Sequence, residues 1–336
     1  MALKAKKTTP AILVLVIFFI LIFLPVIGVV KADDTICIRD DGSIEGTNHI
    51  LRDGNIYTLT DDINVNASSF YGIKVETDNI VIDGAGHTIH GAGIGRGIEI
   101  ANPYNTTIKT GYNVTVTNIT IRDFEIGVAV FGYWGNIIDG VILAGNTITR
   151  NDVGIRFSSY SSYADNLITG NNITANRIGV YFEMGHYGHE EGNLVVGNWI
   201  AHNQVGMQFL WLGDYYSWKP DPFYMNNRIY NNSFITNSQN VVNAHIIYDP
   251  DCVNIWDNGI SGNYWSNYNG TDANGDKIGD TPYIIDPRNQ DNYPRTSPHD
   301  IVVISEFPLW VLLPLFVTTT LIIIVCKQRL PKESRI

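Results

Sequence analysis

A run of oxygen-bearing residues near the end of the sequence has the spacing of a calcium-binding loop. It lies in GNYWSNYNGTDANGDKIGDTPYIID, residues 262–286. The positions that could supply ligands alternate along the chain: Asp272, Asn274, Asp276, the carbonyl of Ile278, and Asp280. Calcium takes such oxygens at such intervals, although Lys277 and Tyr283 stand where an EF-hand needs Gly and Glu. Asp286 or Asp291 could complete the set of ligands. A cation-free turn is the alternative, and we predict a structural calcium site.

Three charged residues could instead carry out catalysis. Asp152 and Arg177 occupy the same position in neighbouring copies of a repeat, so strands stacked about 4.8 Å apart would bring them together. Arg156 lies on the same repeat copy as Asp152. A polysaccharide lyase could use an arginine as base, and a glycoside hydrolase could use paired carboxylates. An acid beside a base is also an ordinary surface ion pair, so we favour a protein without enzymatic activity.

A histidine-containing loop raises the question of a transition metal. The segment EMGHYGHEE, residues 183–191, contains His186, His189 and Met184. These side chains can bind copper or zinc. The spacing fixes no third ligand, so we expect a polar loop and predict no copper site.

Aromatic residues gather in the segments that follow the last strand of successive repeat copies. These segments are FGYWGNIID, SSYSSYADN, EMGHYGHEEGN and LWLGDYYSWKPDPFYMNN. The aromatic residues of interest are Tyr133, Trp134, Tyr160, Tyr163, Tyr187, Trp211, Tyr215, Tyr216 and Trp218. Equivalent connections of stacked repeats leave on one side, and aromatic rings stack on sugar rings while polar neighbours bind the hydroxyls. We predict a glycan-binding face, with packing against the protein wall as the alternative.

An internal repeat predicts the elements that must position these residues. Five copies align at 118–130, 145–157, 170–182, 197–209 and 231–243, with glycine at 127, 154, 179 and 206 and asparagine at 240. Apolar residues flank most anchors, Ile or Phe stands six positions earlier, and in the four later copies Asn stands three and eight positions earlier. Short alternating strands with Gly and Asn turns at this period predict an all-β parallel β-helix rather than a β-sandwich. Stacked Asn side chains can form hydrogen-bonded ladders at its corners.

Three opening motifs, the repeats and the closing motif together carry a family resemblance. The opening motifs are IRDDGSIEGT, RDGNIYTLTDDI and TDNIVIDGAGHTIHG, and the closing motif is the segment 262–286. With these the chain resembles the archaeal NosD-like right-handed parallel β-helix proteins. The resemblance implies a pectate-lyase-like single-stranded solenoid, grouped with carbohydrate-binding and sugar-hydrolase β-helices. It adds a third function, an accessory role in copper-enzyme maturation, but fold alone does not establish activity.

Both ends of the sequence predict export and membrane anchoring. Three lysines precede an apolar run at 11–30, which is typical of a signal peptide at 1–32, with an uncleaved anchor as the alternative. A second apolar run at 307–326 is followed by basic residues, which predicts a transmembrane helix and a cytoplasmic tail at 327–336. Between these segments we expect an N-terminal cap with first coils at 33–100, repeats at 101–260, a cap at 261–295 and a linker at 296–306. In the cap at 261–295 we expect Trp265, Tyr264 and Tyr268 to plug the open end of the β-helix. The bulk of this single-pass protein is then extracellular.

Charge and cysteine content narrow the choice of partners. The chain has a formal net charge of −11, and eight Lys or Arg but one acid lie in the terminal segments, so the exterior part is near −18. That sign excludes nucleic acid and leaves glycans or cell-surface proteins as partners besides the membrane. Seven N-x-S/T triplets predict a glycoprotein. Cys37 and Cys252 could form a bridge outside the cell or remain separate buried thiols.

Overall fold

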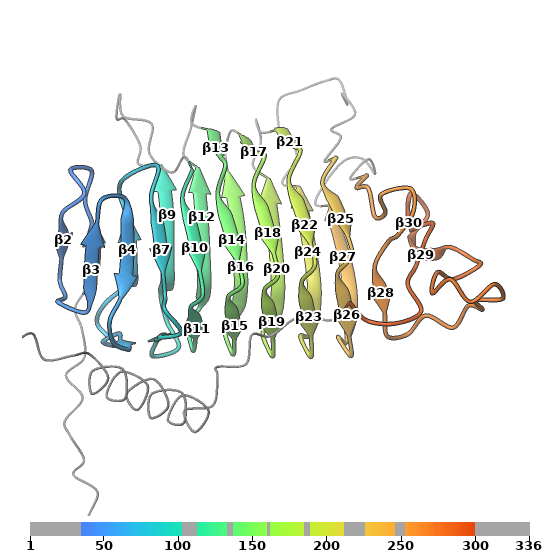
Figure 1. Ribbon diagram of the computed structural model, residues 1–336, viewed down its shortest axis with the longest axis horizontal. Coiled ribbons are helices and arrows are strands. Elements are labelled where there is room, and N and C mark those ends of the chain that lie inside the picture. The colour runs from blue at the N-terminus through green and yellow to red at the C-terminus, as the bar shows by residue number, and fades with distance from the viewer. Residues whose placement is uncertain are drawn as a thin grey trace, which may run out of the picture. The chain divides into compact units, whose positions relative to one another are not determined.

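The computed structural model describes residues 35–102, 113–132, 137–159, 162–184, 189–211, 226–245 and 253–299, which form a β-solenoid (Figure 1). Met1–Pro298 and His299–Ile336 are separate compact units, and the architecture below concerns the first. The described residues form strands, turns and bends but no helix, so none of them supplies an apolar helix of membrane-spanning length. The predicted signal peptide at 1–32 and transmembrane helix at 307–326 lie outside the described residues.

Three long sheets form the walls of the solenoid, and each complete coil adds one strand to each sheet. The first sheet has nine strands, in the order β2 (Ile44–Glu45), β1 (Ile36–Ile38), β6 (Tyr71–Val75), β9 (Arg96–Asn102), β12 (Ile126–Gly132), β16 (Val153–Ser159), β20 (Ile178–Met184), β24 (Val205–Trp211) and β27 (Gln239–His245). The second has β25 (Arg228–Tyr230), β22 (Leu194–Val196), β18 (Leu167–Thr169), β14 (Ile142–Ala144), β10 (Thr115–Thr117), β7 (Val81–Asp83), β4 (Ile56–Leu59) and β3 (Ile50–Asp53). The third has β28 (Tyr264–Trp265), β26 (Ser233–Ile235), β23 (Trp199–Ala201), β19 (Asn172–Thr174), β15 (Thr147–Thr149), β11 (Thr120–Arg122), β8 (Thr88–His90) and β5 (Ile63–Asn64).

Two smaller sheets and a few antiparallel pairs complete the unit. One small sheet joins β13 (Ile137–Asp139), β17 (Ser162–Ala164) and β21 (His189–Glu191), and a hairpin joins β29 (Tyr283–Asp286) and β30 (Asn289–Asp291). Within the long sheets the strands pair in parallel, except for the N-terminal pairs β1–β2 and β3–β4. The predicted parallel β-helix is therefore confirmed for the described residues.

The sequence repeat is the repeat of the coils. Ile121, Ile148 and Ile173 pair in register in the third sheet, and their side chains are fully buried in the core. The repeated glycine has a steric cause, because a Cβ atom on Gly154 would lie 2.6 Å from the carbonyl oxygen of Gly179. Only a residue without a side chain lets the coils stack this closely at that corner.

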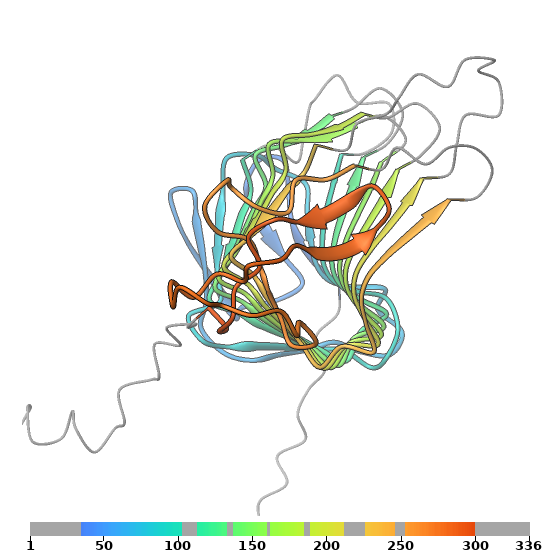
Figure 2. The same ribbon diagram turned by 90° about the vertical axis from the view of Figure 1, so that its right-hand side faces the viewer.

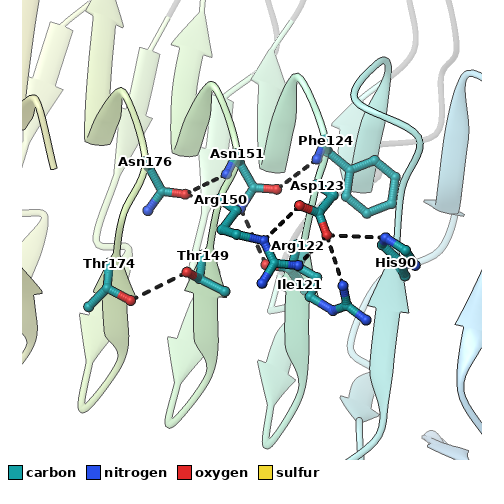
Figure 3. A network of polar contacts seen from close by, with 10 residues as sticks. All are labelled: His90, Ile121, Arg122, Asp123, Phe124, Thr149, Arg150, Asn151, Thr174 and Asn176. Atoms are coloured by element: carbon teal, nitrogen blue, oxygen red, sulfur yellow. Dashed lines mark hydrogen bonds and ion pairs between the residues drawn. The ribbon is translucent and has the colours of Figure 1, made fainter. Parts of the chain in front are cut away.

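Asparagine ladders run along the corners of the solenoid. Asn146, Asn171 and Asn198 belong to one ladder, in which the Oδ1 atoms of Asn171 and Asn198 each accept from the backbone N–H and the side-chain amide of the Asn one coil earlier. The second predicted ladder contains Asn151 and Asn176, and its first step reaches the N–H of Phe124, as Figure 3 shows. Both ladders were predicted. A third, through Asn166, Asn193, Asn227 and Asn254, was missed.

The C-terminal end of the core is closed by aromatic rings. Trp265 is buried between Phe234 and Tyr283, with ring centroids 4.4 and 4.3 Å away, and Trp256 packs beside it at 5.9 Å. The hairpin of β29 and β30 lies across this end in Figure 2. The predicted aromatic plug is confirmed for Trp265, but Tyr264 was wrongly assigned to it. Tyr264 follows Ser233 in the register of the third sheet, so it lies on the outer face.

A buried carboxylate ends one of the ladders inside this cap. Asp291 accepts hydrogen bonds from the N–H of Asn263 at 2.7 Å and from Trp265 Nε1 at 2.9 Å through Oδ2, and from the N–H of Tyr293 at 3.0 Å through Oδ1. Burial raises its pKa to about 6, although these N–H donors act in the opposite direction. Asp291, which we had considered as an extra calcium ligand, is thus part of the core of the cap.

Candidate functional site

The outer face of the first sheet carries two rows of side chains in register. One row contains Glu99, Ala129, Arg156, Tyr181, Gln208 and Val242, and the next contains Ala101, Phe131, Ser158, Glu183, Leu210 and Ala244. These positions lie two and four residues after the repeated glycine, where alternation along a strand points side chains away from the core. The polar members of the two rows meet on β16 and β20.

Arg156, Ser158, Tyr181 and Glu183 form what we call the Arg156 cluster. Arg156 donates from Nε at 2.9 Å and also from Nη2 to Glu183 Oε2, and Ser158 Oγ lies 3.3 Å from the same oxygen. The guanidinium carbon is 5.6 Å from the centre of the Tyr181 ring. The side chains of Arg156 and Glu183 are 31% and 15% exposed, so the ion pair is shielded but reachable. It offers charged donors, a carboxylate and an aromatic ring within one small area.

Tyr181 is a proton donor rather than a base in this setting. Its burial, together with the nearby carboxylate of Glu183, raises the pKa of the hydroxyl to about 12. The phenol therefore stays protonated at ordinary pH. The cluster can bind a ligand hydroxyl or carbonyl from this O–H as well as from the guanidinium.

A second shielded ion pair lies toward the N-terminal end of the sheet, between Glu99 of the first row and Arg96 at the start of β9. Arg96 pairs with Glu99, whose side chain is only 4% exposed. The Arg96 guanidinium also lies over the rings of Phe70, Tyr71 and Phe131, at 5.5, 6.0 and 5.8 Å from their centres. Arg96 and Arg156 are thus each paired with a carboxylate and packed on aromatic rings, and Lys74 in the same row pairs with Glu76, which makes this part of the face close to neutral.

The residues that we considered for catalysis form two separate ion pairs. Asp152 and Arg177 lie together as the register predicted, with Nε–Oδ1 and Nη2–Oδ2 distances of 2.6 and 2.8 Å. Both are about half exposed, at 47% and 49%, and the hydrogen-bonded guanidinium lowers the pKa of Asp152. This geometry is that of a surface ion pair. Arg156 pairs with Glu183 instead, a partner that sequence reasoning missed because it compared only the column two residues before the glycine.

The predicted aromatic face falls almost entirely outside the described residues. Tyr133, Trp134, Tyr160, Tyr187, Tyr215, Tyr216 and Trp218 are not described, and for Tyr163 and Trp211 only the backbone, on β17 and β24, is described. The strand ends that precede these segments are in register, since Gly132 pairs with Ser159, and Met184 pairs with both Ser159 and Trp211. The four segments therefore start from the same edge of the first sheet, beside Glu183, and the aromatic face stays a prediction.

The predicted calcium loop is held together by its own hydrogen bonds. Asp272 accepts from the N–H groups of Gly275 and Lys277 at 2.8 and 2.9 Å, and Asp276 accepts from the N–H of Ile278 at 2.8 Å. Asp280 accepts from Thr271 and Ala273. No group of three or more acidic, His or Cys side chains arranged for a metal ion occurs among the described residues. Calcium binding by Asp272, Asn274, Asp276, Ile278 and Asp280 remains a prediction.

Cysteine and the histidine loop add little to the site. Cys37 is a buried free thiol on β1 whose pKa is raised by burial, and Cys252 lies outside the described residues. His186 also lies outside them, and the side chains of Met184 and His189 are not described. That the loop at 183–191 forms no copper site therefore remains a prediction.

A protein-family model matches most of the chain. The family described as "Periplasmic copper-binding protein (NosD)" matches residues 32–270, which include every coil of the solenoid. A search of curated proteins found no match, and neither did a search of solved structures. The matched segment covers well over half of the chain and coincides with a parallel β-solenoid whose opening and closing motifs agree with the resemblance seen in the sequence. The chain therefore belongs to the NosD family.

Proposed function

We propose that this extracellular β-helix protein binds a glycan on the outer face of its first sheet and performs no chemistry on it. The family is described as periplasmic, which agrees with a solenoid outside the cytoplasm. The observation that carries the proposal is the Arg156 cluster, which combines donors, an acceptor and an aromatic ring next to the edge from which the aromatic segments start. In this proposal the C-terminal segment at 307–326 anchors the protein in the membrane.

Sugar recognition follows from the chemistry of the Arg156 cluster. A sugar presents vicinal hydroxyls that can accept from a guanidinium and donate to a carboxylate at the same time, and its ring C–H groups pack on an aromatic face. Arg156, Glu183 and Tyr181 supply these three groups, and their mutual hydrogen bonds and packing hold them in place before any ligand binds. Trp134 and Trp218 from the segments after the strands, and Trp211 at the end of β24, would add further stacking.

A polysaccharide lyase or glycoside hydrolase is the second candidate. The adjacency of an arginine, a carboxylate and a protonated tyrosine on β16 and β20 favours it, because lyases need a base and a proton donor near a neutralising group. In the described part of this face, however, Arg156 is engaged as a cation with Glu183, which is the wrong protonation state for a base. We therefore rank binding ahead of catalysis.

Copper, which the family description names, does not fit the described residues. They contain no cluster of His, Cys, Asp or Glu suited to a metal, and Met184 and the two His residues of the 183–191 loop have no described side-chain geometry. No step of the proposed function passes through copper. An accessory role in copper-enzyme maturation is the third candidate.

The test uses the full chain, purified in mild detergent from a bacterial host. It is applied to a glycan array first with calcium and then with a chelator, and glycans that bind are assayed for new reducing or unsaturated ends. Binding without product supports the proposal, whereas product formation would establish the enzyme. Absence of binding to any glycan would refute the proposal.

A matched pair of variants locates the site. Arg156→Ala removes two charge-assisted donors, so we expect a loss of at least about tenfold in affinity, equivalent to about 1.4 kcal/mol. Arg150→Ala removes an arginine from the ion pair with Asp123, beside the third sheet, and should leave affinity unchanged. Equal effects of the two variants would place the glycan elsewhere, and Trp218→Ala tests whether the loops take part.

A further inference from the structure

The outer face of the third sheet carries a small aromatic platform near its C-terminal end. In one row of the register, Asn172, Trp199, Ser233 and Tyr264 follow one another on β19, β23, β26 and β28. Trp199 and Tyr264 are partly exposed, whereas Ser233 between them is fully buried. In the adjacent row Ala201 is fully buried beside the partly exposed Ile235. Small residues thus lie beneath a surface made by two aromatic side chains and one aliphatic side chain, which we call the platform.

The spacing of the two aromatic residues is set by the sheet. Trp199 and Tyr264 are two strands apart, which corresponds to about 9.6 Å between their backbone positions. Two successive pyranose rings of an extended β-1,4-linked chain advance by nearly the same length. In a sugar chain that runs across the strands, parallel to the axis of the solenoid, Trp199 and Tyr264 can therefore contact two alternate sugar rings.

Hydroxyl groups continue the same face beyond the platform. Thr147 precedes Asn172 in the Trp199 row, and Thr149 and Thr174 precede Ala201 in the adjacent row. Their Oγ1 atoms lie 3.5 Å apart for Thr149 and Thr174, and Figure 3 shows the two side chains on neighbouring strands. Neutral donors and acceptors at regular strand intervals suit the hydroxyls of a sugar polymer.

The charged end of this face is already neutralised in part. Arg122, Arg150 and His90 surround the carboxylate of Asp123 (Figure 3), with Arg150 Nε and Arg122 Nη1 each 2.9 Å and His90 Nε2 3.1 Å from one of its oxygens. The hydrogen bond from Arg150 is the main cause of the lowered pKa of Asp123. The two arginines are engaged, and the exterior part of the chain is strongly acidic, so the face favours an uncharged ligand over a polyanion.

We propose that the third sheet holds a second carbohydrate site, separate from the Arg156 cluster, at which Trp199 and Tyr264 stack on alternate rings of an extended, uncharged polysaccharide. The platform supplies apolar contact and the threonine rows supply hydrogen bonds. The site needs no loop and no metal, because all of its side chains project from strands of the solenoid wall. A protein carrying both sites can hold a glycan along two of its faces.

The test measures binding of the full chain, in mild detergent, to three soluble polymers: hydroxyethylcellulose, a β-1,4-mannan and polygalacturonate. Affinity gel electrophoresis gives a dissociation constant for each. We expect binding to at least one neutral polymer and weaker binding to polygalacturonate. Trp199→Ala should weaken neutral-polymer binding about tenfold, and Trp199→Phe should restore part of it because a ring remains.

Matched controls separate this site from the first one. Tyr293→Ala removes an exposed aromatic residue of the cap and should change nothing, and thermal melting of each variant checks that the fold is retained. Equal affinities for Trp199→Ala, Tyr264→Ala and wild type would overturn the platform while leaving the Arg156 cluster to be judged by Arg156→Ala. Tightest binding to polygalacturonate, or binding to no polymer, would also overturn it.

Discussion

Removing one asparagine from the core ladders should cost more stability than any exposed polar substitution in the solenoid. Asn171 is fully buried, and its side chain makes four hydrogen bonds. Its Oδ1 accepts from N and Nδ2 of Asn146 at 2.9 and 3.0 Å, and its Nδ2 donates to the carbonyl of Leu143 at 2.8 Å and to Asn198 Oδ1 at 2.9 Å. Asn171→Ala deletes all four bonds at once.

The magnitude follows from the number of bonds. Each buried hydrogen bond contributes about 1 kcal/mol net, so four give about 4 kcal/mol. The N–H of Asn146 is left without its ladder acceptor in a place that water reaches poorly, which adds to the cost. A loss of this size is a large part of the 5–15 kcal/mol that typically stabilises a folded domain.

A neighbouring asparagine provides the control. Asn172 is the next residue but its strand position faces outward, and its Oδ1, although buried, has no hydrogen-bond partner among the described residues. Asn172→Ala should change stability by less than about 0.5 kcal/mol. Urea unfolding of the full chain in mild detergent, followed by far-UV circular dichroism, measures both. If the two variants unfold at the same urea concentration, the ladders do not stabilise the fold as argued here.

Three further perturbations test the cap and the coils. Burial raises the folded-state pKa of Asp291 to about 6, above its ordinary value of 3.8, so the protonated carboxyl stabilises the folded state fully below about pH 4. This stabilisation, up to about 3 kcal/mol, is lost as the pH rises through 6. Asp291→Asn should flatten this part of the curve of stability against pH, and an unchanged curve would show that Asp291 does not titrate in this way. Gly154→Ala places a Cβ 2.6 Å from a backbone oxygen and should destabilise the folded state by about 3 kcal/mol. Gly145→Ala has open space around the new Cβ but a φ of +67°, and should destabilise the folded state by about 1 kcal/mol. Thermal melting of the two variants measures the difference. If the loop at 272–280 binds calcium, the melting temperature should be higher in calcium than in a chelator, and Asp276→Asn should reduce this difference. Identical melting curves in calcium and in chelator would show that the loop is a turn that binds no cation.

The coil architecture was predictable because stacking imposes one pattern on every copy. Glycine is needed at each corner where two coils approach closely, as at Gly154 and Gly179. Asparagine is needed where a corner must satisfy backbone groups without water, as at Asn171. These requirements recur once per coil, so the repeated glycines and asparagines can be recognised in the sequence. The third ladder was not predicted, because Asn166 and Asn193 stand just before the repeat copies at 170–182 and 197–209 and not within them.

The candidate sites were less predictable because they depend on which side chains face outward on neighbouring strands. Arg156 and Glu183 are 27 residues apart, and only the register of β16 and β20 makes them partners. Tyr264 was assigned to the plug from its place in an aromatic cluster, but strand alternation sends Trp265 inward and Tyr264 outward.

By itself the sequence determined the fold class, the period of the coils, two of the three ladders and the family resemblance, because each depends on local spacing repeated along the chain. The tertiary structure decided which surface residues meet: the Arg156–Glu183 pair, the exposed Asp152–Arg177 pair, the burial of Asp291 and the platform of Trp199 and Tyr264. Those contacts join residues of different coils. Their chemistry depends on shielding from water and on distances across strands, which no single copy of the repeat contains.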